Sequence, residues 1–427
     1  MKRKFGFMFM ILAMIFLASC ESKGKKITCK PENFSEKISE LKSEGTYNVI
    51  VTGTISNNKK FLNDLAAALK QDRTVKIHLD LSESEGLKEF YSGASNLLGV
   101  SLPPSIKKLS TKSFRGTNIK YVDFPKGNEK FIAEENAIYT KDHKILRAVL
   151  GGATELNVAE GTEKIVSKAI KDLDNLEKVM LPSTLTELER NNFVKCPSLT
   201  LVDSESSQIK EIVWCFHDLP NVQVKLPKTL EYLEDSFKNL KIINIKLPEK
   251  LIYINNSFIA LDDITEIELP DSLEFVISSF VDCKKINRIN FGNNLKILYS
   301  GFNLCPELKS ISLPASLIRL AQYNRYFYGG NGEWNFDFDI ELADTSGWIW
   351  NSSSNRIWGE NKFENLSQEI LSSPEKLREF INTESLDNEY IGIWKNEYDF
   401  ISEPLQRGEW RGTWYGFCKN REFEHDM

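Results

Sequence analysis

The pair Leu-Pro recurs along this chain of 427 residues, and in the second half the pairs follow one another at an almost constant interval. The steps from Pro227 are 21 residues to Pro248, 22 to Pro270, 22 to Gly292 and 22 to Pro314. A unit of this length cannot bury its own apolar side, so such units must stack and share one continuous core. The period therefore predicts a solenoid.

Each unit carries further fixed positions, and the stretch "GFNLCPELKSISLPASLIRL" (301–320) shows them together. Leu308, Ile311 and Leu313 alternate with polar residues, which predicts a short strand with these side chains inside and a proline at its end. The Leu-x-x-Leu spacing that follows predicts a turn or a short helical segment on the opposite side. A large residue recurs ten or eleven residues after the proline position, namely Tyr91, Phe114, Ile170, Phe193, Phe216, Phe237, Phe258, Phe280 and Phe302.

These positions make the chain similar to the leucine-rich repeats of BspA-like surface proteins of spirochaetes and oral anaerobes. The similarity covers repeats over roughly 82–320, and "NEKFIAEENAIYTKDHKILRAV" resembles a hairpin insertion common in that family, placed here at 126–158. It implies an α/β leucine-rich repeat solenoid with short strands on one face and turns or short helical segments on the other. Two stretches depart from the family: "VDSESSQIKEI" (202–212) lacks its Leu-Pro pair, and the Trp-rich tail (401–427) is unexpected.

A solenoid exposes apolar core at both ends and needs caps. An α/β N-terminal cap is predicted at 45–81, where two alternating stretches flank a helix with Phe61, Leu62, Leu65 and Leu69 on one face. A small ligand-binding α/β domain is the alternative, but this segment has no Gly-rich phosphate loop.

An aromatic-rich C-terminal cap module is predicted at 321–400, where "ADTSGWIW" resembles the last module of the family. Packing over the last repeat is the favoured interpretation of Trp348 and Trp350. Trp410 and Trp414 lie among glycines and charged residues, so they are candidate aromatic contacts for sugars or for a partner's side chains, and packing stays the alternative.

The first residues, 1–19, have the pattern of a signal peptide, with a basic start and an apolar run of 13 residues that is too short to span a bilayer comfortably. The sequence "LASC" that ends at Cys20 resembles the bacterial lipobox, which implies cleavage before Cys20 and its lipidation. An ordinary signal peptide with an incidental cysteine is the alternative. Residues 20–44 begin polar and Lys-rich, which predicts a flexible tether to the membrane, with an ordered first strand as the alternative.

The remaining cysteines are interpreted as core residues. Cys196, Cys283 and Cys305 share a position that holds leucine in four other repeats, so they are expected to be buried thiols. Cys283 and Cys305 lie in adjacent repeats, and a disulfide between them is the alternative.

No motif for catalysis, a metal or a cofactor stands out. The four histidines are scattered, and neither a nucleophile elbow nor a phosphate loop is present, so we expect no enzyme, no cofactor and no small-molecule substrate. The net charge of −6 at pH 7 argues against a nucleic acid partner.

The resemblance implies a lipid-anchored protein, exposed on the outer membrane, that binds host matrix proteins or other bacteria. A structural or assembly lipoprotein that faces the periplasm is the alternative, and a glycan-active enzyme is the least favoured reading. The strand register predicts an outward binding face, to which Tyr121 and Asp123 of an earlier repeat also belong. Its candidate residues are Lys178, Met180, Gln223, Lys225, Asn244, Lys246, Glu266, Glu268, Arg288, Asn290, Ser310 and Ser312.

Overall fold

The computed structural model describes residues 24–322, with gaps at 42–43, 72–73, 220–221, 242–244, 300, 303, 315 and 318, and four further strands at 339–342, 350–351, 393–394 and 415–418. The signal peptide, Cys20, Trp348, Trp410 and Trp414 lie outside the described residues, as do most of the predicted C-terminal module and tail. The chain divides into two compact units, Met1–Glu177 and Lys178–Met427, which are described separately.

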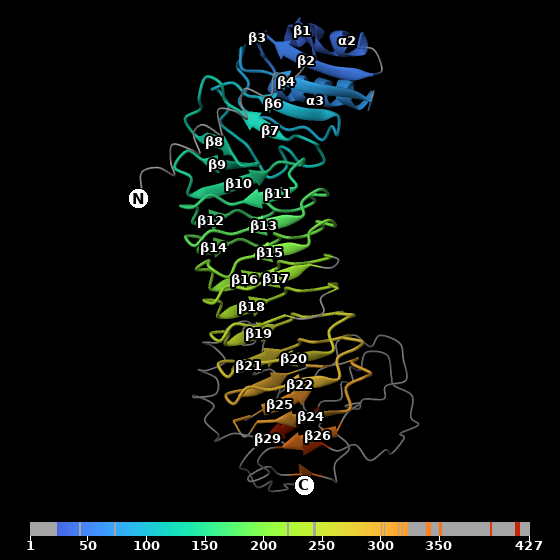
Figure 1. The fold of residues 1–427 in the computed structure, drawn as a ribbon, viewed down its shortest axis with the longest axis vertical. Helices are drawn as coiled ribbons and strands as arrows, with labels where there is room; N and C mark the ends of the chain where they lie inside the picture. Colours follow the sequence, from blue (N-terminus) through green and yellow to red (C-terminus); the bar gives the residue numbers. More distant parts are fainter. Residues whose placement is uncertain are drawn as a thin grey trace, which may run out of the picture. The chain divides into compact units, whose positions relative to one another are not determined.

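The first unit begins with a parallel sheet, whose strands are ordered β1-β2-β4-β6-β7 (Figure 1). The helix α3 connects β2 to β4 and buries Leu62 and Leu65 in the core, because its apolar residues share one face. The elements are β1 (Lys25–Cys29), η1 (Pro31–Asn33), α2 (Phe34–Ser39), β2 (Gly45–Val51), β3 (Gly53–Thr54), α3 (Asn58–Gln71), β4 (Val75–Asp80), β5 (Ser84–Glu85), β6 (Leu97–Ser101) and β7 (Tyr121–Asp123).

The expected tether at 20–44 is wrong for much of its length. β1 pairs in parallel with β2, from Lys25 opposite Tyr47 to Cys29 opposite Val51. Phe34 at the start of α2 is buried and packs edge-on against the Phe61 ring, with 6.0 Å between the ring centroids. The cap therefore starts about twenty residues earlier than predicted. The strand at its start was missed because the lysines of "KKITC" are uncommon in strands.

An antiparallel element interrupts the repeats of the first unit. β8, β9 and β10 pair as two consecutive hairpins, and β10 then pairs in parallel with β12. Glu135 and Asn136 join β8 to β9 with φ of 44° and 69°, the left-handed pair that a two-residue hairpin turn requires. The "YTKDHK" stretch leads from β9 to β10. The elements are β8 (Phe131–Glu134), β9 (Ala137–Thr140), β10 (Ile145–Val149), β11 (Glu155–Asn157) and β12 (Lys164–Ile165).

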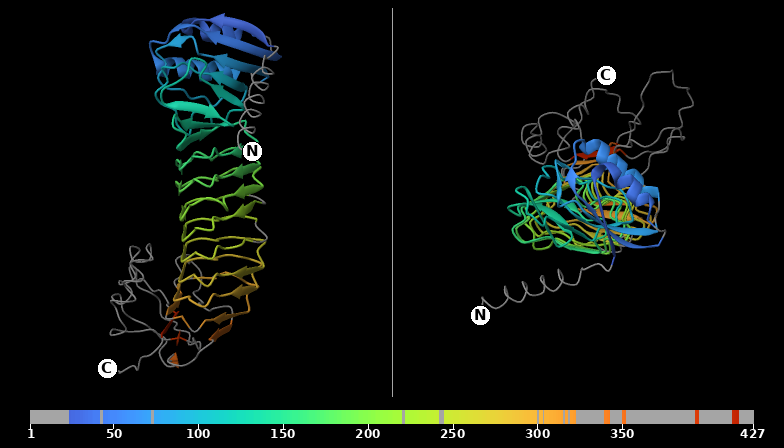
Figure 2. Two further views of the ribbon diagram at one scale, coloured as in Figure 1. Left: turned by 60° about the vertical axis from the view of Figure 1, so that its left-hand side comes forward. Right: turned by 90° about the horizontal axis from the view of Figure 1, so that it is seen from above.

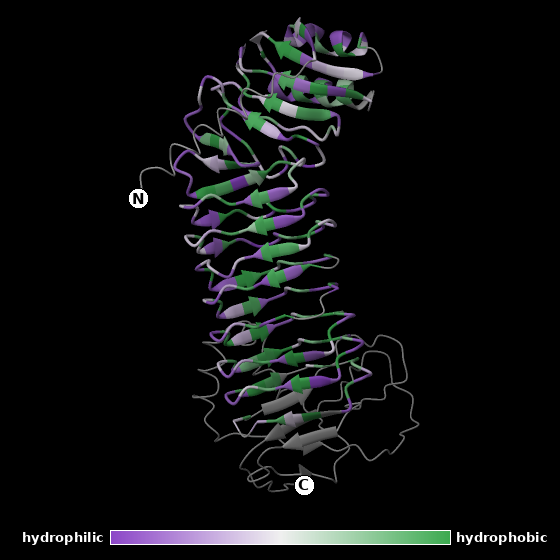
Figure 3. Cartoon of the chain, in the orientation of Figure 1, coloured by the Kyte–Doolittle hydropathy of each residue, from purple (hydrophilic) through white to green (hydrophobic). Residues whose placement is uncertain are grey.

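In the second unit most repeats contribute two short strands, and the strands of neighbouring repeats stack as the rungs of two ladders (Figures 1 and 2). The first ladder is interrupted at residues 245–248, which form no strand, so β17 and β20 belong to separate sheets. The first ladder consists of the strands that lead into the Leu-Pro position of each repeat, whether or not the pair itself is present. In β13, β17 and β20 the central side chain is buried and its neighbours point outward, so polar and apolar residues alternate (Figure 3). The strands of this ladder are β13 (Lys178–Met180), β15 (Leu201–Asp203), β17 (Gln223–Lys225), β20 (Glu266–Glu268), β22 (Arg288–Asn290) and β24 (Ser310–Leu313), and β26 (Asp339–Leu342) pairs with β24.

The second ladder corrects one detail of the predicted repeat. The Leu-x-x-Leu stretch on the opposite side forms strands, not turns or short helical segments. The three-residue strands pair in parallel from β16 to β25, and β29 joins β25 in the antiparallel direction. The strands on this side are β14 (Glu187–Leu188), β16 (Glu211–Val213), β18 (Tyr232–Glu234), β19 (Tyr253–Asn255), β21 (Phe275–Ile277), β23 (Ile297–Tyr299), β25 (Arg319–Gln322) and β29 (Tyr415–Cys418), while β27 (Trp350–Asn351) and β28 (Ile393–Trp394) pair with each other.

A column of stacked phenylalanines fills the core between the ladders. Adjacent rings are nearly parallel, with centroids 4.7 Å to 5.1 Å apart. Each phenylalanine has a positive φ between 55° and 63°, a conformation that is costly for a bulky residue and is held here by stacking on both neighbours. The column consists of Phe193, Phe216, Phe237, Phe258, Phe280 and Phe302.

A line of buried serines runs beside the phenylalanine column. The hydroxyl of Ser257 accepts a hydrogen bond from the backbone N–H of Ser236 at 3.1 Å and donates to the carbonyl of Asn255 at 2.8 Å. The N–H of Ser257 donates in turn to the hydroxyl of Ser279 in the next repeat. These side chains satisfy backbone groups that no strand pairs with, which explains why serine precedes phenylalanine in "DSF", "NSF" and "SSF".

The predicted interior positions are confirmed. Cys196, Cys283 and Cys305 are buried free thiols. The thiol of Cys305 donates to the carbonyl of Phe280 at 3.2 Å. The pKa of Cys283 is raised by its hydrogen bond with Cys305 and by burial, which favours the protonated thiol. Cysteine therefore acts here as a small apolar side chain whose thiol donates to backbone carbonyls, among them that of Phe258 for Cys283 and that of Phe280 for Cys305.

Candidate functional site

The outward face of the first ladder is a regular surface that the repeats of the second unit present. In β13, β17 and β20 the central side chain is buried and both neighbours are exposed. The rungs are in register, since Lys178 pairs with Leu201 and Leu201 pairs with Gln223. Backbone hydrogen bonding thus fixes the spacing of these side chains at the strand separation of about 4.8 Å.

Most of the predicted face residues lie where the register put them. Asn244 falls outside the described residues, and Ser310 is described only as part of β24. Whether the face binds anything stays a prediction. The residues that project from it and are exposed or half-buried are Lys178, Met180, Gln223, Lys225, Lys246, Glu266, Glu268, Arg288, Asn290 and Ser312.

The structure adds one rung that the sequence pattern missed. β15 lies between β13 and β17 although its repeat lacks the Leu-Pro pair, and it adds Leu201 and Asp203 to the face. Ser204 stands in place of the leucine, and its hydroxyl donates to the Lys225 carbonyl at 2.6 Å. The alternation of Leu201, Val202 and Asp203 was the available signal.

The charges on the face change sign along the ladder. Lys225 Nζ forms an ion pair with Asp203 Oδ2 across one rung, at 2.7 Å, and that hydrogen bond raises the pKa of Lys225. Glu266 and Glu268 follow two repeats later, and Arg288 lies directly opposite Glu266 in the register. The face is therefore a mixed mosaic of basic and acidic side chains, which suits a protein surface of matching pattern better than a polyanion.

The second ladder offers less accessible surface beside its central rungs. In β21 all three residues are buried, so Phe275 and Ile277 are covered as well as the inward Val276. Tyr253 in β19 is also buried. In the described residues of the second unit, the outward side chains of β13, β17 and β20 are therefore more exposed than those of β19 and β21.

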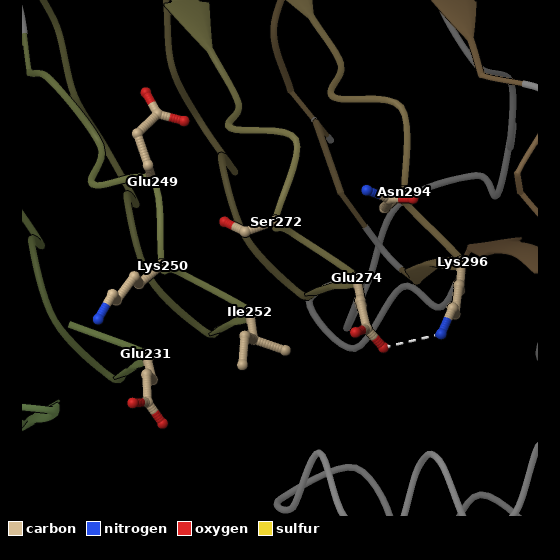
Figure 4. Close-up of a pocket in the computed structure, with 8 residues that line it drawn as sticks. All are labelled: Glu231, Glu249, Lys250, Ile252, Ser272, Glu274, Asn294 and Lys296. Carbon is tan, nitrogen blue, oxygen red and sulfur yellow. Dashed lines mark hydrogen bonds and ion pairs between the residues drawn. The ribbon is translucent and has the colours of Figure 1, made fainter. Parts of the chain in front are cut away.

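A shallow polar groove lies at the corner that leads into the second ladder (Figure 4). Its one ion pair joins Glu274 Oε2 to Lys296 Nζ at 3.0 Å. The groove is open to solvent and mixes both charges, which is typical of a hydrated surface rather than of an enclosed ligand pocket. It is lined by Glu231, Glu249, Lys250, Ile252, Ser272, Glu274, Asn294 and Lys296.

In the first unit the outer face of the N-terminal sheet carries a fixed polar group. The Tyr121 ring lies across Gly99, where an added Cβ would come within 2.1 Å of Tyr121 Cε1. The Tyr121 hydroxyl is 3.0 Å from Nδ1 of His78, and burial lowers the pKa of that imidazole. Burial, with a smaller contribution from the charge of Asp80, raises the pKa of Asp123. Tyr121 and Asp123 are therefore half-buried and held in place rather than free to adapt to a partner.

Among the described residues, no three histidine, cysteine or acidic side chains lie together as a metal ion would require. None of the helices in this part of the chain is long and apolar enough to cross a bilayer.

The stacked rungs, the leucine positions and the phenylalanine column define a leucine-rich repeat solenoid, as the sequence predicted. The chain belongs to the family described as the BspA type leucine rich repeat region, which matches in six copies over residues 33–142, 152–235 and 213–331. No curated protein matches the sequence.

Solved structures of similar proteins come from several bacteria. A leucine-rich repeat protein from Bacteroides ovatus is 17% identical over 63% of this chain and 75% of its own, with a TM-score of 0.41. One from Eubacterium ventriosum is 15% identical over 67% of this chain and 80% of its own, with a TM-score of 0.34. A leucine rich cell surface protein from Faecalibacterium prausnitzii is 14% identical over 65% of this chain and 80% of its own, with a TM-score of 0.28.

Proposed function

We propose that this chain is a lipid-anchored protein of the bacterial cell surface that binds protein partners through the outward face of the first ladder. The observation that carries the proposal is the row of outward, mixed-charge side chains on two groups of paired strands, β13-β15-β17 and β20-β22. Backbone pairing already fixes the spacing of these side chains within each group, so only their own rotamers have to be ordered when a partner binds.

The anchor is the second part of the proposal, and it rests on the "LASC" sequence that ends at Cys20. Lipidation there would hold the chain at a membrane through several acyl chains, which is stable where one chain is not. The replacement Cys20→Ala should release the protein from the membrane fraction of its native cells into the soluble fraction. If the variant stays with the membrane, another segment anchors the chain.

Protease treatment of intact cells tests on which side of the outer membrane the chain lies. Surface exposure predicts that added protease degrades the chain while a periplasmic control protein stays intact. Complete protection until the outer membrane is opened would contradict the proposal and favour the structural role in the periplasm.

The face is tested with the triple replacement of Lys225, Lys246 and Arg288 by glutamate. Binding to immobilised host matrix proteins, or to cells of other bacteria, should fall by at least about tenfold, since charge reversal both removes attraction and adds repulsion. Biolayer interferometry of the full chain measures the change.

The matched control replaces Lys228, Lys241 and Lys250 by glutamate, which changes the net charge equally outside the ladder face. Lys228 pairs with Glu205 at 3.1 Å much as Lys225 pairs with Asp203. The control should bind as the unmodified chain does. Equal losses in both triple variants would show a general charge effect and would remove the ladder face from the proposal.

A further inference from the structure

One tryptophan in the described residues is exposed, and it occupies a position that small polar residues hold elsewhere. Trp214 follows β16 and lies two residues before Phe216 of the phenylalanine column. Its side chain is 44% exposed and its φ is 52°. Asparagine, aspartate and serine tolerate this left-handed conformation, whereas a bulky residue is strained in it. Four other repeats of the second unit have Asn191, Asp235, Asn256 and Ser278 at this position, each with a positive φ, while Lys168 holds it in the first unit with a φ of 64°.

The indole of Trp214 is held rigidly in spite of its exposure. It stacks on the His217 imidazole with an interplanar angle of 1° and 5.6 Å between centroids, and Lys238 Nζ lies 5.6 Å from its centre. The backbone N–H of Trp214 donates to the Glu234 carbonyl at 3.1 Å, and the backbone carbonyl of Trp214 accepts from the Asn191 backbone N–H at 2.7 Å, so the backbone that carries the ring is paired on both sides. A flat aromatic surface is therefore fixed in place before any ligand arrives.

The surroundings of this ring are polar. His217 Nε2 lies 2.6 Å from the Asp235 carbonyl oxygen, and Lys238 pairs with the Asp235 carboxylate at 2.9 Å. Asn239 donates to the carboxylate of Asp218 at 3.0 Å. The exposed part of the ring therefore lies beside charged groups, and the positive charge of Lys238, 5.6 Å from the ring centre, disfavours a cationic ligand.

A protein partner favours a different setting. Energetically important residues at protein interfaces cluster in an apolar centre that excludes water and is poor in charge. The other large apolar side chains exposed in the described residues are Met180, on the first ladder, and Leu304, several repeats away. Neither extends the Trp214 ring into an apolar patch.

We propose that Trp214 is the platform of a carbohydrate-binding site that takes a neutral pyranose. A pyranose ring has one face of C–H groups, which packs on a flat aromatic ring, and a rim of hydroxyls, which bond to surrounding carboxylates and amides. The Trp214 indole supplies the first feature, and Asp218, Asp235 and Asn239 supply the second. The site binds a sugar without turning it over, and it does not depend on the protein-binding face of the first ladder.

Saturation-transfer NMR on the full chain, purified in a detergent that contains no sugar, tests the site. The probes are the methyl pyranosides of glucose, galactose, mannose and N-acetylglucosamine. We expect at least one of them to receive saturation, strongest at the C–H protons of one ring face. In Trp214→Asn the affinity should fall by about tenfold, since a stack worth about 1.4 kcal/mol corresponds to a factor of ten.

The substitution is chosen so that folding cannot explain the loss. Asparagine is the residue that two other repeats have at this position, so Trp214→Asn should unfold at the same temperature or a higher one. Trp214→Tyr keeps an aromatic ring and should keep affinity within a few-fold. Leu304→Asn is the matched control, because Leu304 is 47% exposed and has a φ of 59°. Leu304 lies two residues after Phe302 of the column, and the equivalent position of another repeat already holds an asparagine, Asn239.

The control variant should bind the probes as the unmodified chain does. Three results would overturn the proposal: no probe receives saturation from the unmodified chain, Trp214→Asn binds as tightly as the unmodified chain, or Leu304→Asn loses binding to the same extent. A protein partner lost with Trp214→Asn while no pyranoside binds would assign the ring to a protein interface instead.

Discussion

Replacement of Phe258 by alanine probes the phenylalanine column at its middle. The Phe258 side chain is fully buried, and its ring lies 5.1 Å from that of Phe237 and 5.0 Å from that of Phe280. Loss of a buried phenylalanine side chain costs about 3–5 kcal/mol of unfolding free energy, through lost burial and the cavity left behind. Each aromatic stack contributes about 0.5–1.5 kcal/mol beyond burial, and this substitution removes two.

The expected cost of Phe258→Ala is therefore about 5 kcal/mol, since the two contributions overlap in part. No relief of backbone strain offsets it, because alanine has a side chain at Cβ and gains little at a φ of 58°. Urea unfolding followed by circular dichroism measures the change. A second effect is expected in the same curves: repeats contact only their neighbours, so a broken column should lower the m-value or split the transition.

The variant Phe258→Leu is the control for volume. It keeps most of the buried side chain but loses the aromatic stacks. The two effects together should cost about 1–2 kcal/mol of unfolding free energy, close to the range for apolar replacements of similar size. A cost below about 2 kcal/mol for the alanine variant, or equal costs for the two variants, would refute the account of the column as a main source of stability.

Three further outcomes follow from buried polar groups. Ser257→Ala should cost about 1–3 kcal/mol in the same urea assay, because the N–H of Ser236 would lose its buried acceptor. Asp123→Asn should stabilise the chain at pH 7 and make no difference below the ordinary carboxyl pKa. The raised pKa of Asp123 means that the folded state binds its proton more tightly, so stability is lost as pH rises through that pKa; unfolding curves from pH 4 to 7 that stay parallel for both chains would contradict this. Burial raises the pKa of Cys215 to about 12, so a maleimide at pH 8 should leave it unmodified in the native chain and modify it in urea, as peptide mass spectrometry would report.

The repeat positions were predictable because they recur. Each of the leucine, phenylalanine and cysteine positions occurs in several units, so a comparison of the units separates the recurring inward residues from chance similarities. The outward face followed from the same register, since a strand alternates its side chains. Asp203 was missed because its rung lacks the Leu-Pro pair that marked the others, although the strand itself needs only the alternation.

Other features were beyond a local pattern. Strands of the second ladder such as β18 have only three residues. Over so few residues a Leu-x-x-Leu spacing fits a helical turn as well as it fits a bend followed by a strand. β1 forms because it pairs with β2, and the composition of "KKITC" does not indicate such pairing with a distant segment. Trp214 could have been found, because four other repeats of the second unit have a small polar residue at its position.

The direction of β29 has a consequence for how far the array can grow. The pairs from β16 to β25 are parallel, whereas β29 runs antiparallel to β25, from Arg319 opposite Cys418 to Gln322 opposite Tyr415. A ladder of near-identical rungs offers, at its last strand, an edge on which a further copy of the repeat could polymerise. A reversed strand presents a different hydrogen-bond pattern there, so it acts as a terminator that disfavours end-to-end fibre growth.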